Sequence, residues 1–378
     1  MFSVIVASDK FKGTLSSSEV AGAVRDGVRR VRPDAVVGSV LVADGGDGTL
    51  AAAAAAGFSL VPVTATGPTG ERVRSGFVRR GEVAVVELAD VSGLIRLPGG
   101  RPAPMTATSR GAGELVAAAI SGGCTRVILG IGGSACTDGG AGLIRALGGR
   151  VLSGDGVDVA EGGAALATAV SLDLTALRER LAGVEVVVAC DVDNPLTGPT
   201  GAAATYGAQK GADAAQISEL DAVLGHWADL VARSTGHDLR DVPGAGAAGG
   251  VGFAALALLG ASLRPGIELV LDLVGFGERL AGVDLVVTGE GSLDEQTLHG
   301  KAVAGVAAAA RAAGIPVVAV CGSNRLDAAR LREAGISAAY ALTDLEPDVR
   351  RCIADPVPLL RRLGERIATD HVPIATLR

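Results

Sequence analysis

The sequence predicts an α/β protein with two α/β domains, and three observations support this prediction. Short apolar runs alternate with segments of helical periodicity near the N-terminus, and the same alternation returns near the C-terminus. The 378 residues are also more than one hydrophobic core usually organises. We therefore expect a doubly wound parallel sheet formed by both chain ends, residues 1–65 and 283–378, with a mixed α/β domain inserted at residues 66–282.

The N-terminal elements form a βαβα series. The continuous apolar run at residues 4–7 is typical of a buried parallel strand. Ser16 and Glu19 have the spacing of a capping box, and apolar residues recur after them with helical period. A second strand at 36–42 and a helix at 50–56 complete the series.

The middle of the chain differs from its two ends. Alternating residues at 72–88 predict an antiparallel hairpin that turns near Gly81. Further strands are expected at 126–130 and 185–190, and a long amphipathic helix at 214–234. The C-terminal elements are then expected at 283–288 (strand), 301–313 (helix), 316–321 (strand) and 326–334 (helix).

The composition excludes several classes of partner. The formal net charge of −7 provides no general attraction to nucleic acid or to an anionic membrane, and no apolar segment is long enough to span a bilayer. The five cysteines lack CxxC spacing and several lie in apolar runs, which is typical of reduced core thiols. The N-terminus has no signal-peptide pattern, so we expect a cytoplasmic protein.

Five loops that follow predicted strands carry acidic, basic or hydroxyl residues, and four of them also contain glycine. In an open parallel sheet, ligands bind at the carboxyl ends of the strands. One such loop is adequately explained as a turn with a helix cap. Five in succession favour a shared ligand site. These loops are residues 8–13, 44–49, 132–140, 191–196 and 289–297, and Gly300 and Lys301 follow the last of them.

The residue types in these loops indicate phosphoryl transfer. That reaction needs amides and lysines for phosphate groups, carboxylates for a metal ion, and an acid to take the proton of the acceptor hydroxyl. Gly132, Gly133 and Ser134, expected to open a helix, can present N–H groups to an anion. The candidate phosphate or carboxylate partners are Lys12, Lys210 and Lys301, and the carboxylates that could divide the base and metal roles are Asp191, Asp193 and Asp294.

Other nucleotide-binding motifs fit less well. A Walker A match fails around Gly300 and Lys301, because Ala302 follows the lysine and the first glycine of the motif is absent. Residues 130–135 follow a predicted strand and resemble a dinucleotide fingerprint, with Asp155 as the ribose-binding acid. A nicotinamide-dependent dehydrogenase of a small hydroxy acid is therefore the first alternative. A non-catalytic metabolite-binding protein is the second.

Taken in order, the loop segments resemble those of the type-1 glycerate kinase family. The resemblance covers nearly the whole chain, and the segments are short singly but specific jointly. Asp47 stands where the family more often has Glu, and Lys10 where it often has Ser. The matching segments are residues 9–13, 43–49, 132–140, 189–196, 209–212, 244–250 and 288–301.

The resemblance implies a flavodoxin-like domain and an inserted α/β domain with the site between them. It also implies D-glycerate, ATP and Mg²⁺ as ligands, and 2-phosphoglycerate as the usual product, with 3-phosphoglycerate as the alternative. A homodimer is a further expectation. The catalytic candidates are Asp191, Lys12 and Asp294, with Asp193 or Asp294 on the metal. The expected substrate- and ATP-binding residues are Lys10, Asp44, Gly45, Gly46, Asp47, Gly132, Gly133, Ser134, Asp138, Asn194, Lys210, Gly291 and Lys301.

Overall fold

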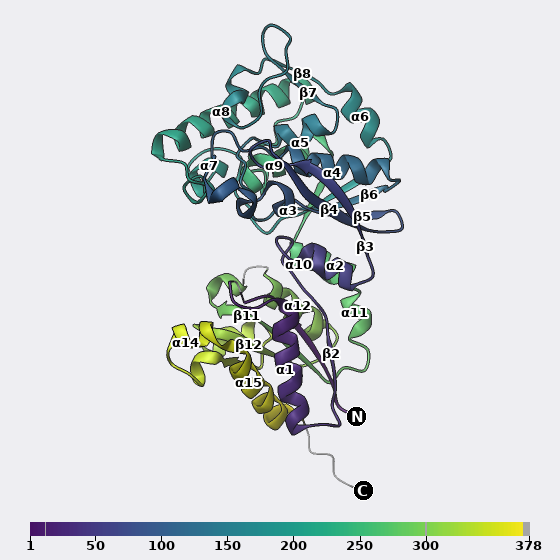
Figure 1. Ribbon diagram of the computed structural model, residues 1–378, viewed down its shortest axis with the longest axis vertical. Coiled ribbons are helices and arrows are strands. Elements are labelled where there is room, and N and C mark those ends of the chain that lie inside the picture. The colour runs from purple at the N-terminus through teal and green to yellow at the C-terminus, as the bar shows by residue number, and fades with distance from the viewer. Residues whose placement is uncertain (12, 299–300, 373–378) are drawn as a thin grey trace. The chain divides into compact units, whose positions relative to one another are not determined.

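The chain divides into two compact units. The computed structural model describes residues 1–11, 13–298 and 301–372. Unit 1 comprises Met1–Asp44 and Ile267–Arg378, so both ends of the chain contribute to it, and unit 2 comprises Gly45–Gly266. Figure 1 colours each unit by residue number.

Unit 1 contains a parallel sheet. Its strands are β1 (Ser3–Ser8), β2 (Val36–Ser39), β11 (Leu285–Leu293), β12 (Val317–Asn324) and β13 (Ala338–Ala341). Their order across the sheet is β13-β12-β11-β1-β2, and each pair is parallel. Counted along the unit, this is the order 2-1-3-4-5 of the flavodoxin-like fold. The predicted α/β class and doubly wound parallel sheet are confirmed.

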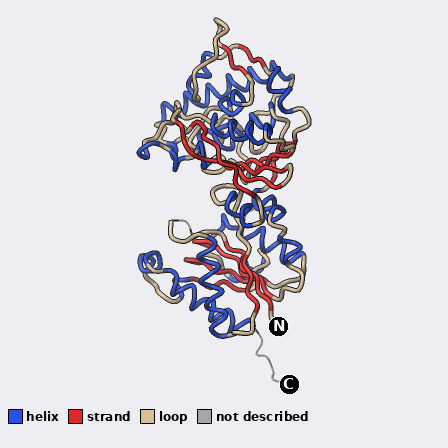
Figure 2. Tube along the Cα trace, turned by 45° about the vertical axis from the view of Figure 1, so that its right-hand side comes forward, coloured by secondary structure: helices blue, strands red, loops and turns tan. Residues whose placement is uncertain are grey.

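Helices cover both faces of this sheet, as the blue segments beside the red strands show in Figure 2. Val4 and Val6 of β1 belong to a core that includes side chains of α1 and α15, whereas α12 contacts β1, β11 and β12 without contributing to that core. The predicted capping box opens α1: the Ser16 hydroxyl accepts the Glu19 N–H, and the Glu19 carboxylate accepts the Ser16 N–H. The helices of the unit are α1 (Ser17–Val31), α11 (Phe276–Arg279), α12 (Ala302–Ala312), α13 (Ala328–Glu333), α14 (Val349–Ala354) and α15 (Pro356–His371).

Helices α1 and α15 lie side by side and approach closely at two glycines (Figure 1). A Cβ added to Gly27 of α1 would lie 2.0 Å from the Arg361 carbonyl oxygen of α15. One added to Gly364 of α15 would lie 2.4 Å from the Val24 carbonyl oxygen of α1. The absence of side chains at these positions therefore lets the two backbones touch.

Unit 2 contains a mixed sheet. Its strands are β3 (Ser59–Thr66), β4 (Arg72–Arg80), β5 (Val83–Glu87), β6 (Arg126–Gly130), β9 (Glu185–Ala189) and β10 (Ser262–Arg264), in the order β10-β9-β6-β5-β4-β3. The pairs from β10 to β5 are parallel, and β4 pairs antiparallel with β5 and β3. The predicted hairpin is present, and Gly81 in its turn has a φ of 60°. A small hairpin, β7 (Arg150–Leu152) and β8 (Ser171–Asp173), pairs separately.

The division between the units differs from the predicted boundaries at 65/66 and 282/283. Strand β3 pairs along its whole length with β4, from Ser59 opposite Arg79 to Thr66 opposite Arg72, so these residues belong to unit 2. Helix α10 (Gly266–Leu273) crosses the second boundary. A Cβ added to Gly305 of α12 would lie 2.5 Å from the Ile267 side chain, so α10 packs on α12 in unit 1. The pattern of apolar residues alone did not predict the pairing of β3 with β4 or the contact of α10 with α12.

Helices and a buried tryptophan complete unit 2. Trp227 is fully buried on α8, and its indole N–H donates to the Gly139 carbonyl at 3.0 Å. None of the helices in the described residues is both long and apolar enough to cross a membrane. The helices of the unit are α2 (Thr49–Ala55), α3 (Ala89–Ser92), α4 (Arg110–Ser121), α5 (Ala141–Ala146), α6 (Thr175–Leu181), α7 (Ala202–Tyr206), α8 (Ala214–Thr235) and α9 (Ala247–Leu258).

Candidate functional site

A cavity of about 380 Å³ lies at the carboxyl edge of the sheet in unit 1. Asp9 and Lys10 follow β1, Asp44 follows β2, and Glu290 lies near the end of the neighbouring β11; all four line the cavity. The topological switch point of this fold lies between β1 and β11, where doubly wound sheets bind ligands. The fold therefore places charged side chains where a ligand is expected.

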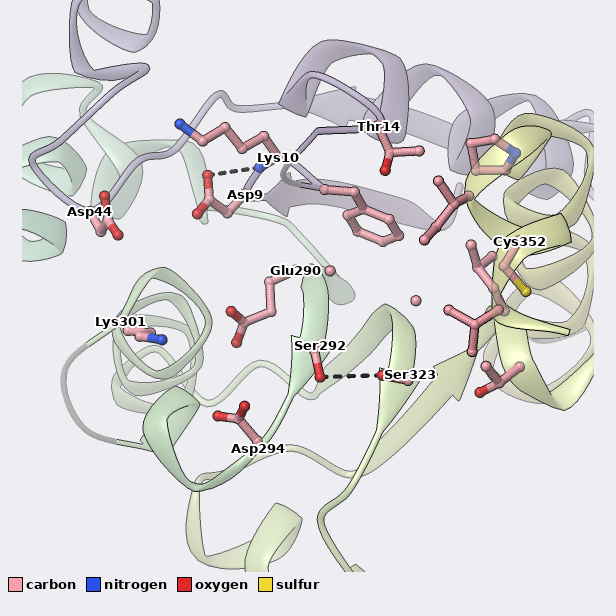
Figure 3. A pocket seen from close by; sticks show the side chains of 18 residues that line it. Asp9, Lys10, Thr14, Asp44, Glu290, Ser292, Asp294, Lys301, Ser323 and Cys352 are labelled. Carbon is pink, nitrogen blue, oxygen red and sulfur yellow. Dashed lines mark hydrogen bonds between the residues drawn. The ribbon is translucent and has the colours of Figure 1, made fainter. Parts of the chain in front are cut away.

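Three carboxyl groups share one side of this cavity. Figure 3 shows Asp9, Asp44 and Glu290 around a common space. Burial is the largest of the effects that raise the pKa of Asp9 to about 6. The charges of Asp44 and Glu290 act in the same direction, and the Lys10 N–H, which donates to Asp9 at 2.7 Å, opposes the shift. Such a group of partly desolvated carboxylates is favourable for a cation.

Several predicted site residues line the same cavity. They are Lys10, Asp44, Gly291, Asp294 and Lys301. The Asp294 carboxylate accepts the Gln296 N–H at 2.9 Å, and the Lys301 ammonium donates to the Gln296 side chain at 3.2 Å, so one loop holds both charges. Lys12 lies outside the described residues.

Two charged residues of the cavity were not selected from the sequence: Asp9 and Glu290. Both lie in loops that the sequence singled out. The signal that could have found them is position, because each lies at or directly after the carboxyl end of a strand beside the switch point.

A second group of predicted residues gathers at the carboxyl edge of the sheet in unit 2. A Cβ added to Gly45 would lie 2.6 Å from the Ala189 Cβ at the end of β9, and one added to Gly132 would lie 2.9 Å from the Gly46 Cα. The Asp191 carboxylate, two residues after β9, accepts the Gly266 N–H at 2.8 Å. The loops around Gly45, Gly132 and Asp191 therefore converge, and Gly45 and Gly132 lie where an added Cβ would meet neighbouring atoms.

Ser134 and Lys210 form a buried pair in unit 2. The Lys210 ammonium is 3% exposed and donates to the Ser134 hydroxyl at 3.0 Å and to the Cys136 carbonyl at 2.5 Å. Burial lowers the pKa of Lys210, against the negative charges of Cys136 and Asp138. This geometry makes Lys210 a support for the 132–136 loop.

Asp138 is fully buried beneath the same loop. Its carboxylate accepts N–H groups of Ser109, Gly140 and Gly142, and the Ser109 hydroxyl. Burial raises its pKa, and these hydrogen bonds oppose the rise. The carboxylate therefore holds the backbone around Ser109, Gly140 and Gly142 in place, and this arrangement favours a structural role over ligand contact.

The expected helix directly after Gly132–Ser134 is not present. Gly133 has a φ of 72° and Gly140 one of 74°, and α5 begins only at Ala141. These left-handed glycines interrupt a helical path, so the N–H groups of Gly132 and Gly133 lie on an exposed loop. The dinucleotide fingerprint loses its helix N-terminus for the same reason, and Asp155 is exposed in the loop between β7 and β8.

Of the remaining predicted residues in unit 2, two are exposed and one is buried. Asp47 and Asp193 are exposed. Asn194 is 8% exposed, and its amide group donates to the Pro195 carbonyl at 3.4 Å. Its Oδ1 atom is buried and has no hydrogen-bond partner among the described residues.

The carboxylates of the unit 1 cavity suit a magnesium ion that takes only one or two ligands from the protein. Within residues 1–11, 13–298 and 301–372, no group of three or more His, Cys, Asp or Glu side chains is arranged to hold a metal ion. Magnesium usually binds through one or two carboxylates, with water and substrate phosphates completing its shell. The Asp9, Asp44 and Glu290 group fits that mode, whereas the predicted ligands Asp193 and Asp294 belong to different units.

Comparison with known proteins gives one consistent result. The model of the glycerate kinase family matches residues 4–371. The chain is 45% identical to a glycerate kinase of Bacillus subtilis (strain 168) and 43% identical to a glycerate 2-kinase of Escherichia coli (strain K12), each over 342 residues and 90% of both chains. It also matches a crystal structure of a glycerate kinase 2 from Salmonella typhimurium LT2 with a TM-score of 0.83, 40% identity and 97% coverage of both chains.

Proposed function

The chain belongs to the glycerate kinase family, and from that premise we propose that it transfers the γ-phosphoryl group of ATP to D-glycerate, giving 2-phosphoglycerate and ADP. The observation that carries this proposal is similarity along the whole chain to glycerate kinases, one of them a glycerate 2-kinase. The cavity with its lysines and carboxylates supports a phosphorylated ligand in unit 1.

We assign the nucleotide phosphates to the charged side of the unit 1 cavity. Lys10 and Lys301 would neutralise phosphate oxygens, and Lys12 would act from the same loop as Lys10. One or two carboxylates of the Asp9, Asp44 and Glu290 group would hold Mg²⁺ together with phosphate oxygens. When bound, the ion would neutralise charge on the transferring phosphoryl group.

We assign acceptor activation to unit 2. Asp191 is exposed two residues after β9, and the hydrogen bond from the Gly266 N–H orients its carboxylate at the surface of unit 2. As general base it would take the proton of the D-glycerate hydroxyl. The exposed N–H groups of Gly132 and Gly133 are suited to the glycerate carboxylate.

The decisive experiment is a phosphorus NMR assay of the reaction. Purified protein with ATP, Mg²⁺ and D-glycerate should produce a new phosphomonoester signal as ADP appears. Its chemical shift and proton coupling distinguish 2-phosphoglycerate from 3-phosphoglycerate. Turnover only with another small hydroxy acid would change the substrate, and no turnover with any acceptor would refute the kinase proposal. A cytoplasmic location and a homodimer stay predictions.

A further inference from the structure

The cavity of unit 1 has two halves of different chemistry. Its charged half contains Asp9, Lys10, Asp44, Glu290, Asp294 and Lys301. Its apolar half contains Phe11, Leu342, Val349, Cys352, Ile353 and Pro356. In Figure 3, Cys352 lies on the opposite side of the cavity from Asp44 and Lys301. A ligand that fills the cavity must therefore be charged at one end and apolar at the other.

The apolar half exposes large side chains at the cavity. Val349 and Ile353 lie one helical turn apart on α14 and are 53% and 56% exposed, although both line the cavity. Phe11, by contrast, is 3% exposed and packs in the core of the unit together with Cys352. Exposed apolar surface beside a concave site is a mark of ligand binding.

Backbone and hydroxyl groups separate the two halves. The hydroxyl groups of Ser292 and Ser323 lie 3.2 Å apart at the ends of β11 and β12 (Figure 3). Gly291 and Gly322 adjoin them, and a Cβ added to Gly322 would lie 2.5 Å from the Gly291 carbonyl oxygen. This part of the cavity wall therefore offers hydroxyl groups and bare backbone, which suits a polar, non-ionic part of a ligand.

We propose that the apolar half binds the base of a nucleoside triphosphate, with Ser292 and Ser323 on the sugar hydroxyls and the charged half on the phosphates. This inference rests on the proposed function and deepens it by assigning a base pocket and a sugar contact. The acceptor is a poor alternative occupant, because D-glycerate is a three-carbon acid without an apolar ring. A cavity of about 380 Å³ also exceeds the size of such an acid.

Two probes separate the halves: MgADP, which has a base, and inorganic tripolyphosphate, which has none. Isothermal titration of Ile353→Glu should show about tenfold weaker binding of MgADP, because the apolar surface is replaced by a charge. Binding of tripolyphosphate should stay within about twofold of the wild type. The KM for ATP should rise in the same variant while the KM for D-glycerate does not change.

Matched variants control the interpretation. Ile95→Glu makes the same substitution at an isoleucine of unit 2 that is 77% exposed, and it should alter neither affinity. Lys301→Ala removes a positive charge and should weaken the binding of both MgADP and tripolyphosphate. Val349→Glu repeats the test at the second exposed position of α14 and should behave like Ile353→Glu.

The outcomes distinguish this inference from the proposed function. If folded Ile353→Glu and Val349→Glu, checked by circular dichroism, bind MgADP as the wild type does, the base pocket is refuted even if D-glycerate is phosphorylated. If MgADP binding falls as expected but the wild type phosphorylates no acceptor, the base pocket stands and the kinase proposal fails.

Discussion

Asp9 illustrates how much the pKa of a carboxyl group in a cavity can differ from that of a surface one. It lies directly after β1, partly buried, beside Asp44 and Glu290. Its pKa rises from 3.8 to about 6 because burial and like charges disfavour its ionised form. The folded protein therefore binds a proton there that the unfolded chain releases between about pH 4 and 6, so ionisation of Asp9 makes the fold less stable as the pH rises.

Asp9→Asn should consequently stabilise the protein without Mg²⁺ above pH 6 by up to about 3 kcal/mol. The variant and the wild type should be equally stable near pH 4, where the carboxyl is largely protonated, and should diverge up to about pH 6. Denaturant unfolding at several pH values measures the difference. Equal stability at pH 8 would contradict the assignment of Asp9 as a destabilised anion, and added Mg²⁺ should stabilise only the wild type strongly.

Asp191→Asn should reduce turnover by at least about a thousandfold if Asp191 is the general base. Its melting temperature should stay near that of the wild type, because the amide oxygen can still accept the Gly266 N–H. Steady-state kinetics with D-glycerate and ATP provide the measurement. Asp193→Asn is the neighbouring control: a metal role there predicts a higher Mg²⁺ requirement rather than loss of the base. Near-normal turnover of Asp191→Asn would refute its role.

At the scale of elements, the contact between α1 and α15 depends on the absence of side chains. Gly27→Ala should destabilise the protein by about 3 kcal/mol, because the new Cβ would lie 2.0 Å from a backbone oxygen of α15. Gly22→Ala on the same helix is the matched control: its Cβ meets only an arginine side-chain atom at 3.9 Å, so it should stabilise α1 by up to about 1 kcal/mol. Chemical denaturation compares the two, and similar effects would argue against a tight glycine contact.

The start of α9 contains a different kind of strain. Among the described residues, Ala248 is the non-glycine residue with a positive φ, 53°, and it precedes Gly249 and Gly250 at 68° and 92°. Left-handed backbone costs an alanine roughly 1 kcal/mol, a cost that glycine avoids. Ala248→Gly should therefore raise the free energy of unfolding by up to about 1 kcal/mol, measured from the denaturation midpoint at unchanged m-value. A loss of stability would show that the alanine methyl group packs favourably enough to outweigh the strain.

Local patterns predicted some of these elements well and others poorly. The capping box at Ser16 and the turn at Gly81 are short-range devices, so the sequence alone specified them. The pairing of β3 with β4 depends on contacts between strands, and the first domain boundary was therefore misplaced. The prediction of a helix directly after Ser134 was wrong because glycines with left-handed backbone redirect the loop. The sequence shows the glycines but not their backbone conformation.

The candidate site was predictable to a similar extent. The strand-end loops that the sequence singled out contribute Lys10, Asp44 and Lys301 to the lining of one cavity, and their roles stay predictions. The sequence pattern did not reveal which polar side chains are buried. Asp138 and Lys210 have the residue types of ligand-binding groups, yet they are buried and hydrogen-bonded to the protein itself. Asp9 was missed for the converse reason, since only its environment distinguishes it from neighbouring acids.

At the scale of the whole molecule, each of the described core clusters lies within one of the two units. The clusters around Leu129 and Trp227 contain only residues of unit 2, and the cluster around Val6 only residues of unit 1. Unit 2 is also continuous in sequence. It therefore has the features of a segment that folds alone.

A fragment of residues 45–266 should accordingly unfold in one cooperative transition and should not bind MgADP, because the proposed nucleotide residues lie in unit 1. Circular dichroism during denaturation and isothermal titration supply the two measurements. A fragment without a cooperative transition would contradict the independence of unit 2, and MgADP binding by a folded fragment would contradict the assignment of the nucleotide to unit 1.

The position of β1 between β2 and β11 has a consequence for synthesis on the ribosome. Val4 and Val6 are fully buried between strands that include β11, yet β11 lies in the C-terminal part of the chain. Translation at about 5–20 residues per second needs on the order of 10 to 40 seconds to pass through the intervening unit. During that interval the nascent N-terminal strand lacks its neighbour and presents an unpaired apolar edge. Chaperone capture of this segment is therefore expected until the C-terminal strands emerge and close the sheet.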